Sequence, residues 1–217
     1  MARKIKKKDL KKPDQFQSFF GKTIRYASEN RNKLLLSLGI FILIILSLSG
    51  WHLYRLNYED RAQRMYLSAS GLNNNDKIEI YKEIVKKYPR SNAALTSLYN
   101  MGNIYFNLNA IDKSINAYRE LIEKLREDNV LTTLAYIGLG YCYEAGGNFD
   151  KAVEALNVPI EHGVGGSWEG IIYRNMARIY EKMNKPKEAL EHYKKALNQT
   201  TDTVMEELIK RKISALN

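Results

Sequence analysis

Cysteine and histidine are scarce in this sequence. Its 217 residues include one cysteine, Cys142, which excludes an intrachain disulfide and a CxxC metal site. The three histidines, His52, His162 and His192, are too far apart to form an HExxH zinc motif, and no GxSxG hydrolase motif is present. We therefore expect no enzyme activity, no cofactor and no metal site. A catalytic site assembled only by folding is the alternative.

Acidic residues are scarce at the N-terminus only. Residues 1–33 contain eleven Lys and Arg but three Asp and Glu, so they carry +8 of the net charge of +10. Residues 34–217 are nearly balanced, at +2. Because the excess positive charge is confined to a short tail, we expect no nucleic-acid partner.

Charged residues are absent from residues 34–54, a run rich in Leu and Ile. About 20 apolar residues in a helix cross a hydrocarbon core of roughly 30 Å. Trp51 and Tyr54 stand near the downstream end, where aromatic rings favour the headgroup region. The run predicts one transmembrane helix. A signal peptide cleaved near residues 47–49 is the alternative.

The basic tail predicts the orientation of this helix. Basic segments stay on the cytoplasmic side of a membrane, whereas long downstream domains are exported largely regardless of their charge. We therefore predict that residues 1–33 are cytoplasmic and that residues 55–217 are exported.

The tail also contains an amphipathic segment. Its apolar residues follow helical spacing, and basic residues lie on the opposite face. We predict a helix along the membrane surface, with headgroup contacts from Phe16, Phe19, Phe20, Lys22 and Arg25. The basic run at residues 3–12 would favour anionic lipids. Docking of a cytoplasmic partner or ribosomal RNA to the tail is the alternative.

Strand signals are poor after residue 58, and helical periodicity is strong. Four related segments begin at Tyr58, Leu95, Thr133 and Gly170, at spacings of 37, 38 and 37 residues. Repeats of this length indicate stacked helical hairpins. We predict an all-α fold in which an N-terminal transmembrane helix precedes an α-solenoid of about four hairpins. The expected hairpins are near residues 58–91, 95–128, 133–166 and 170–203, with a capping helix at 204–217.

Small and aromatic residues recur at fixed positions of the repeat. Gly102 and Gly140 would allow the two helices of a hairpin to approach closely, and Tyr105, Tyr143 and Tyr180 would fill the space between hairpins. Residues that favour turns mark the expected connections within the hairpins at 73–76, 107–109, 146–148 and 184–186.

These repeats resemble the tetratricopeptide (TPR) superfamily. The pattern W-x2-L-G-x2-Y followed by A-x3-F is best matched by Tyr173, Met176-Ala177, Tyr180 and Ala189. The resemblance implies a domain that binds proteins or extended peptides.

The complete layout resembles a bacterial envelope family with a short basic cytoplasmic tail, one span and an exported TPR-like domain. The family includes the ancillary subunit of the SecYEG translocon. In residues the resemblance lies in 14–31, in the span and in YKEIVKKYP at 81–89. It implies location in the bacterial inner membrane and partners among Sec translocon subunits and exported chaperones.

In TPR domains the first helix of each hairpin forms an inner, concave face that binds ligands at repeat positions 2, 5, 9 and 12. The resemblance places on this face Thr96, Tyr99, Asn103, Phe106, Leu134, Ile137, Tyr141, Glu144, Ile171, Arg174, Arg178 and Glu181. Only Asn103 and Asn175 match the residues by which some TPR domains clamp a C-terminal carboxylate, so we expect no such clamp. A solvated polar surface is the alternative to a binding face.

Three functions are compatible with these patterns. The first is a membrane-anchored adaptor associated with protein translocation or exported chaperones. The second is a structural assembly factor that uses the same face to hold a component of the envelope or of a cell-surface complex. The third is an enzyme within a repeat scaffold, which no motif favours.

Overall fold

The computed structural model describes residues 15–125 and 130–216, and every regular element in these ranges is helical. This confirms the all-α prediction. The elements are α1 (Gln15–Glu29), α2 (Arg31–Ser68), α3 (Asn74–Lys87), α4 (Asn92–Asn107), α5 (Ile111–Lys124), α6 (Val130–Ala145), α7 (Phe149–Glu161), the 3-10 turn η2 (Gly166–Trp168), α8 (Glu169–Lys182), α9 (Pro186–Gln199) and α10 (Thr203–Leu216).

The chain divides into two compact units, Met1–Leu56 and Asn57–Asn217. The first unit contains α1 and most of α2. Within the described residues, α2 is the one helix that is long and apolar enough to cross a membrane, with a mean hydropathy of 2.4 over its most apolar window and no residue of that window buried. A helix with apolar side chains on all sides and no protein packed against them suits a lipid environment.

Helix α2 continues without a break from residue 31 to residue 68. The sequence suggested a separation between a span ending at residue 54 and a repeat beginning at Tyr58, but no loop lies between them. The chain from Leu53 to Ser68 contains neither proline nor glycine, so nothing interrupts the backbone hydrogen bonds of the helix. The last turns of α2 therefore serve as the first helix of the repeat unit.

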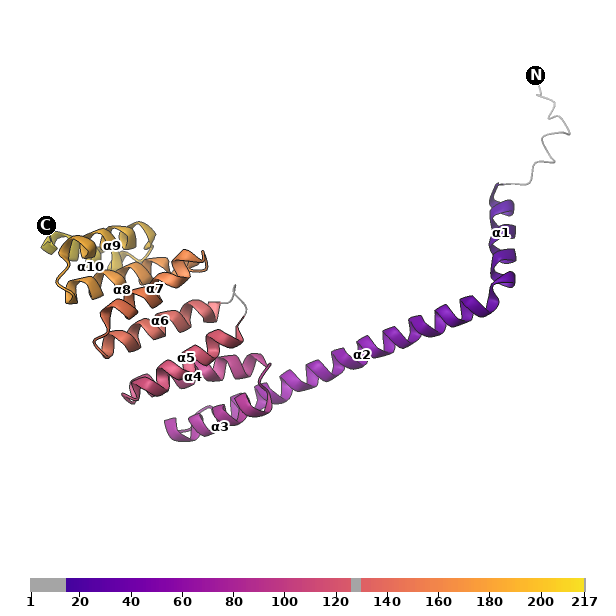
Figure 1. The fold of residues 1–217 in the computed structure, drawn as a ribbon, viewed down its shortest axis with the longest axis horizontal. Helices are drawn as coiled ribbons and strands as arrows, with labels where there is room; N and C mark the ends of the chain where they lie inside the picture. The colour runs from indigo at the N-terminus through magenta and orange to yellow at the C-terminus, as the bar shows by residue number, and fades with distance from the viewer. Residues whose placement is uncertain (1–14, 126–129, 217) are drawn as a thin grey trace, which may run out of the picture. The chain divides into compact units, whose positions relative to one another are not determined.

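The second unit is a stack of helical hairpins (Figure 1). Helices α4 and α5, α6 and α7, and α8 and α9 pack as antiparallel pairs, and α10 packs against α9. The end of α2 pairs with α3 through Tyr66 and Tyr81, whose stacked rings lie 5.5 Å apart.

The turns within three hairpins have the same geometry. Asn109, Gly147 and Asn184 each have a positive φ, of 58°, 72° and 56° respectively. The amide of the following residue donates to the carbonyl of Tyr105, Tyr143 or Tyr180, at 2.8, 2.8 and 2.9 Å. This is the Schellman end of a helix, which requires Gly or Asn in the left-handed region.

Each buried cluster combines residues from neighbouring hairpins. Ile137 of α6 and Leu156 of α7, for example, pack with Ile172 and Ile179 of α8. A hairpin thus buries its apolar side chains partly against the next hairpin, which is the stabilising principle of a solenoid.

Tyr118 of α5 joins two hairpins at an unusually close contact. A Cβ at Gly102 of α4 would lie 2.5 Å from its ring, and a Cβ at Gly138 of α6 would also overlap the ring. Since Tyr118 is 2% exposed, its ring is held between the backbones of α4 and α6.

Candidate functional site

The residues predicted to form a binding face lie on α4, α6 and α8. We call the surface of these helices, together with the end of α2 and with α10, the first-helix face. Ten of the twelve predicted residues are partly exposed, but Ile137 is 6% and Glu144 is 8% exposed. Ile137 packs in the core against α8, and the Glu144 carboxylate faces cations of α8, so neither presents surface to a partner.

Tyrosine–asparagine hydrogen bonds connect successive helices of this face. Asn100 of α4 donates to the hydroxyl of Tyr66 of α2 at 2.7 Å, and Asn175 of α8 donates to the hydroxyl of Tyr141 of α6 at 2.9 Å. The two partners are 34 residues apart in both cases. These bonds fix the spacing of neighbouring hairpins.

Between α4 and α6 the same positions hold different residues. Asn103 takes the tyrosine position and Gly138 the asparagine position of the repeat. Here the hydroxyl of Tyr118 donates to Oδ1 of Asn103 at 2.7 Å while its ring covers Gly138. Tyr118, from the second helix of its hairpin, thus replaces the tyrosine–asparagine hydrogen bond that is missing between α4 and α6.

Charged side chains gather where α6, α8 and α10 meet. The guanidinium of Arg178 binds both oxygens of the Glu144 carboxylate, with Nη2 2.7 Å from Oε2, and Nζ of Lys182 lies 2.8 Å from Oε1. Lys212 of α10 pairs with Glu181 at 2.9 Å. One buried carboxylate therefore holds two cations, and ion pairs brace α8 on both sides.

Replacing Glu144 with alanine is expected to lower the free energy of unfolding by about 1–2 kcal/mol, because charged hydrogen bonds between α6 and α8 are lost. We expect a loss of unfolding free energy near the lower end of this range, because the side chains of Arg178 and Lys182 are 40% and 49% exposed and can be hydrated. Urea unfolding followed by circular dichroism measures the change. The matched variant Glu123→Ala, at an exposed site on α5, should leave the midpoint in place.

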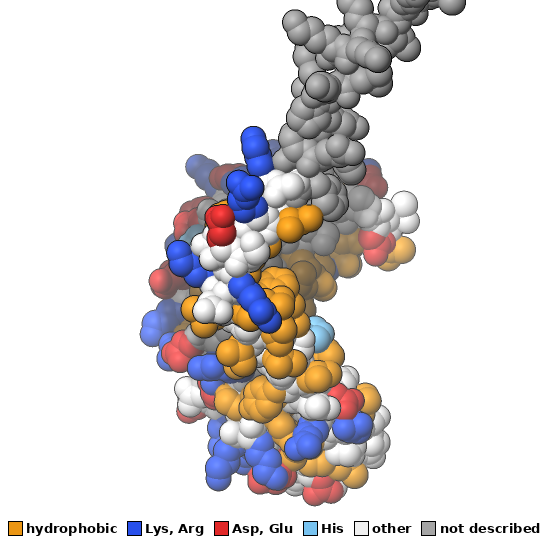
Figure 2. All heavy atoms as spheres, turned by 90° about the vertical axis from the view of Figure 1, so that its right-hand side faces the viewer, with side chains coloured by type: hydrophobic (Ala, Val, Ile, Leu, Met, Phe, Trp, Pro, Cys, Tyr) orange, Lys and Arg blue, Asp and Glu red, His pale blue; other side chains and the backbone are white. Residues whose placement is uncertain are grey.

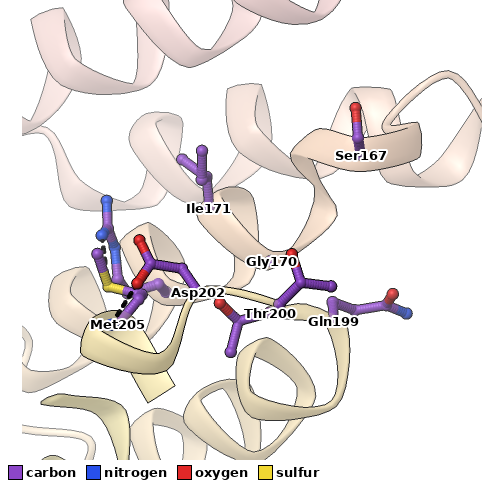
Figure 3. A pocket seen from close by; sticks show the side chains of 9 residues that line it. Ser167, Gly170, Ile171, Gln199, Thr200, Asp202 and Met205 are labelled. Carbon is purple, nitrogen blue, oxygen red and sulfur yellow. Dashed lines mark hydrogen bonds between the residues drawn. The ribbon is translucent and has the colours of Figure 1, made fainter. Parts of the chain in front are cut away.

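Arg174 lies at the edge of a shallow pocket between α8 and the α9–α10 connection. The pocket has a volume of about 230 Å³. Figure 3 shows Asp202 and Met205 near one end and Gly170, Thr200 and Gln199 along its side. Nη1 of Arg174 lies 2.8 Å from the sulfur of Met205. Asp202 accepts the amides of Val204 and Met205 at the start of α10, at 2.9 and 3.2 Å.

Burial raises the pKa of several groups in the repeat unit, among them Tyr193 and Cys142. The pKa of Tyr193 is raised to about 12, mainly by burial and further by the neighbouring carboxylate of Glu181. Burial also raises the pKa of the Cys142 thiol, which lies 3.1 Å from the Ser114 hydroxyl. A buried thiol that stays protonated is a poor nucleophile, so Cys142 acts as a packing residue.

The predicted membrane-surface residues lie on α1 and in the first unit. Phe19, Lys22 and Arg25 are exposed. Phe16 and Phe20 fall within α1, but their side chains lie outside the described part of the chain, as does the basic run at residues 3–12. The headgroup contacts of α1 stay a prediction.

No group of three or more His, Cys, Asp and Glu side chains is arranged to hold a metal ion in the ranges that the structure describes. His192 packs between the rings of Tyr173 and Tyr180, with centroids 6.2 and 4.9 Å away. It therefore belongs to the packing of α8 on α9. The expectation that the chain binds no cofactor and catalyses no reaction remains a prediction.

One side of the molecule has a surface of mixed character. Figure 2 shows hydrophobic side chains gathered in a band on one face of the molecule, with Lys and Arg side chains around it. Such mixed surfaces are common where proteins bind other proteins.

Comparison with known families identifies the fold. The family model described as tetratricopeptide repeat-like domain matches residues 25–217. The chain belongs to this TPR-like family. No curated protein sequence matches it. Stacked repeats of this family expose extended surfaces, and the family fold serves as a scaffold for binding proteins.

Solved structures with the TPR-like fold resemble the repeat unit. A structure of MamA has a TM-score of 0.54 at 18% identity, over 74% of this chain and 79% of that one, and a second MamA structure has a TM-score of 0.51 at 19% identity, over 64% and 74%. TPR-like repeats of a putative kinesin light chain from Podosopora anserina have a TM-score of 0.53 at 14% identity, over 74% and 83%. At these identities the likeness concerns the fold alone.

Several residues of the first-helix face were not among the predicted ones. Lys182 and Lys212 extend its charged part, and Tyr66 and Asn100 link its first two helices. The recurrence of tyrosine and asparagine at a separation of 34 residues is a signal in the sequence that could have found the last two.

Proposed function

We propose that this protein is a membrane-anchored adaptor that acts by binding another protein on its first-helix face. The observation that carries the proposal is the combination of a TPR-like repeat unit with a preceding helix whose apolar run has no buried residue. The repeat unit supplies a protein-binding scaffold, and the apolar helix supplies a means to hold it at a membrane.

Residues 34–54 of α2 would form the span. Leu and Ile dominate this segment, and the described side chains within it lie exposed on every side. In water such a surface would be costly, whereas in lipid it needs no protein partner. Trp51 and Tyr54, with ring centroids 6.3 Å apart, suit the headgroup level.

The direction of the span follows from its flanking charge. The net charge of +8 in residues 1–33 supports a cytoplasmic N-terminus and an exported repeat unit. Helix α1, in which Phe19, Lys22 and Arg25 are exposed, would lie along the cytoplasmic surface and contact anionic lipids.

The proposed partners are translocon subunits and exported chaperones of a bacterial inner membrane. Support comes from the layout of tail, span and exported repeats, which resembles the envelope family of the ancillary translocon subunit. The half-buried aromatic side chains Tyr99, Phe106 and Tyr141 on α4 and α6 suit an extended peptide or a partner helix.

Photo-crosslinking in intact cells tests this function. A photoreactive residue at Tyr99 or Leu134, both on the first-helix face, is expected to capture translocon subunits or exported chaperones, which mass spectrometry would identify. The matched probe at Lys194, exposed on α9, should capture much less, because that surface belongs to the second helix of its hairpin.

The identity of the captured proteins decides among the alternatives. Envelope or cell-surface structural proteins would replace the translocon role by one in assembly. Cytoplasmic proteins alone would reverse the proposed orientation. Equal capture by all three probes would mean that the first-helix face is not the binding surface.

A further inference from the structure

Helix α8 carries a row of three cations on the first-helix face. Arg174, Arg178 and Lys182 follow one another at intervals of four residues. Residues four apart lie on the same side of a helix, and at a rise of 1.5 Å per residue they are separated by about 6 Å along its axis. The three charges therefore form a line along the helix.

Nearby carboxylates do not neutralise all of the positive charge of this row. Glu144 is shared by Arg178 and Lys182, and Glu181 is paired with Lys212 of α10. The Asp202 carboxylate instead accepts the first backbone amides of α10.

Arg174 is the cation of the row that has no carboxylate partner. Within residues 15–125 and 130–216, its guanidinium forms no ion pair, and its hydrogen-bonding contact is the Met205 sulfur. A thioether is a weak acceptor, so most of the donors of this guanidinium remain available. The adjoining pocket of about 230 Å³, lined by Ile171, Thr200 and Thr201, leaves space beside it.

We propose that the Arg174–Arg178–Lys182 row binds an acidic, extended segment of the partner protein, with one carboxylate held by Arg174 at the pocket. The inference rests on the proposed adaptor function and names the chemistry of the segment that it binds. In an extended chain, alternate side chains point the same way at about 6.7 Å intervals. That spacing matches the separation of about 6 Å between successive cations of α8.

The match in spacing specifies the sequence pattern of the bound segment as well as its charge. Acidic residues at every second position would face successive cations of the row, whereas consecutive acidic residues would point alternately toward and away from it. Arg174 can bind a carboxylate through two parallel hydrogen bonds, which makes it the anchor of the segment.

Binding of three fluorescent peptides to the full chain in lipid nanodiscs tests the proposal. The first has three Glu residues that alternate with Ser, so that all three face the row. The second has the same composition with its three Glu residues consecutive, so that the middle one points away, and the third replaces Glu by Gln. Fluorescence anisotropy should detect the first peptide binding most tightly and the Gln peptide at least tenfold more weakly. Equal affinity for the alternating and consecutive peptides would overturn the spacing argument, and equal affinity for the Gln peptide would overturn the proposal.

The Arg174→Gln variant supplies the residue-specific test. It should bind the alternating peptide about tenfold more weakly, as expected for loss of one charged hydrogen-bonded contact. The affinity of Arg174→Lys should lie between those of the parent chain and Arg174→Gln, because lysine keeps the charge but cannot form two parallel hydrogen bonds. The matched variant Lys194→Gln, which removes a charge from the exposed surface of α9, should bind normally.

Two outcomes separate this inference from the adaptor function on which it rests. If no peptide binds while photoreactive residues at Tyr99 and Leu134 still capture a protein, the acidic-segment inference is wrong and the adaptor function stands. If Arg174→Gln binds the peptide as well as the parent chain while its circular dichroism is unchanged, Arg174 is not the anchor and the inference is also wrong.

Discussion

The Gly138→Ala variant is expected to lose about 2–3 kcal/mol of unfolding free energy, because a well-packed core tolerates added atoms poorly. The new Cβ would overlap the ring of Tyr118, which Gly102 confines on its other side. Neither the ring nor the backbone of α6 can move without separating two hairpins. A shift of the urea midpoint, followed by circular dichroism on the full chain, measures the loss.

Gly146→Ala is the matched control for this prediction. Gly146 lies just beyond the end of α6, and a Cβ there would meet only ordinary contacts, at 3.6 and 3.7 Å. The same chemical change should therefore shift the midpoint little. If Gly138→Ala unfolded at the same urea concentration as Gly146→Ala, the close packing of Tyr118 between α4 and α6 would not be a determinant of stability.

Two arginines in the middle of the apolar run of α2 are expected to release the protein from the membrane. Replacing Leu43 and Leu46 by arginine would cost about 5–7 kcal/mol in a lipid-embedded helix, at about 2.5–3.5 kcal/mol for each arginine near the centre. Both side chains are exposed, at 67% and 62%, so no protein contact is lost. Membrane fractionation with an alkaline wash should find the variant in the soluble fraction, while the parent chain sediments.

A matched pair of arginines outside α2 controls for added charge. Asn116 on α5 and Asn198 on α9 are exposed, and their replacement by arginine adds the same charge to the repeat unit. This variant should stay with the membrane. Retention of the Leu43→Arg, Leu46→Arg variant would show that α2 is not what anchors the chain.

The two predictions concern different parts of an adaptor. Gly138 tests whether the repeats hold a fixed spacing, which the first-helix face needs in order to present its side chains in register. Leu43 and Leu46 test whether that face is held at a membrane. A variant that only loses its attachment to the membrane should still bind the acidic peptide through Arg174.

The helical class of this protein and the turns within its hairpins could be predicted from the sequence because they depend on local chemistry. Asn109, Gly147 and Asn184 adopt the left-handed conformation at the turns where the sequence placed breaker residues. The same applies to the apolar run in α2, since composition and length are enough to recognise a helix suited to a membrane.

The side-chain arrangement of the candidate site depended on how the hairpins stack. Repeat positions placed Ile137 and Glu144 on a ligand-binding surface, but the approach of α8 buries both. The sequence likewise marked Gly102 and Gly140 as small packing residues, yet gave no reason to single out Gly138, whose importance comes from a ring on α5.

Sequence alone thus determined the helical class, the turns within the hairpins, the apolar run and the repeat family, because each follows from periodicity and residue type within one segment. Only the tertiary structure decided which side chains of the first-helix face contact neighbouring hairpins and which, like Arg174, remain available to bind a partner. The physical reason is that contacts between hairpins depend on the distance and angle at which they stack. Gly102, Tyr118 and Gly138, which are far apart in the sequence, together set this distance and angle.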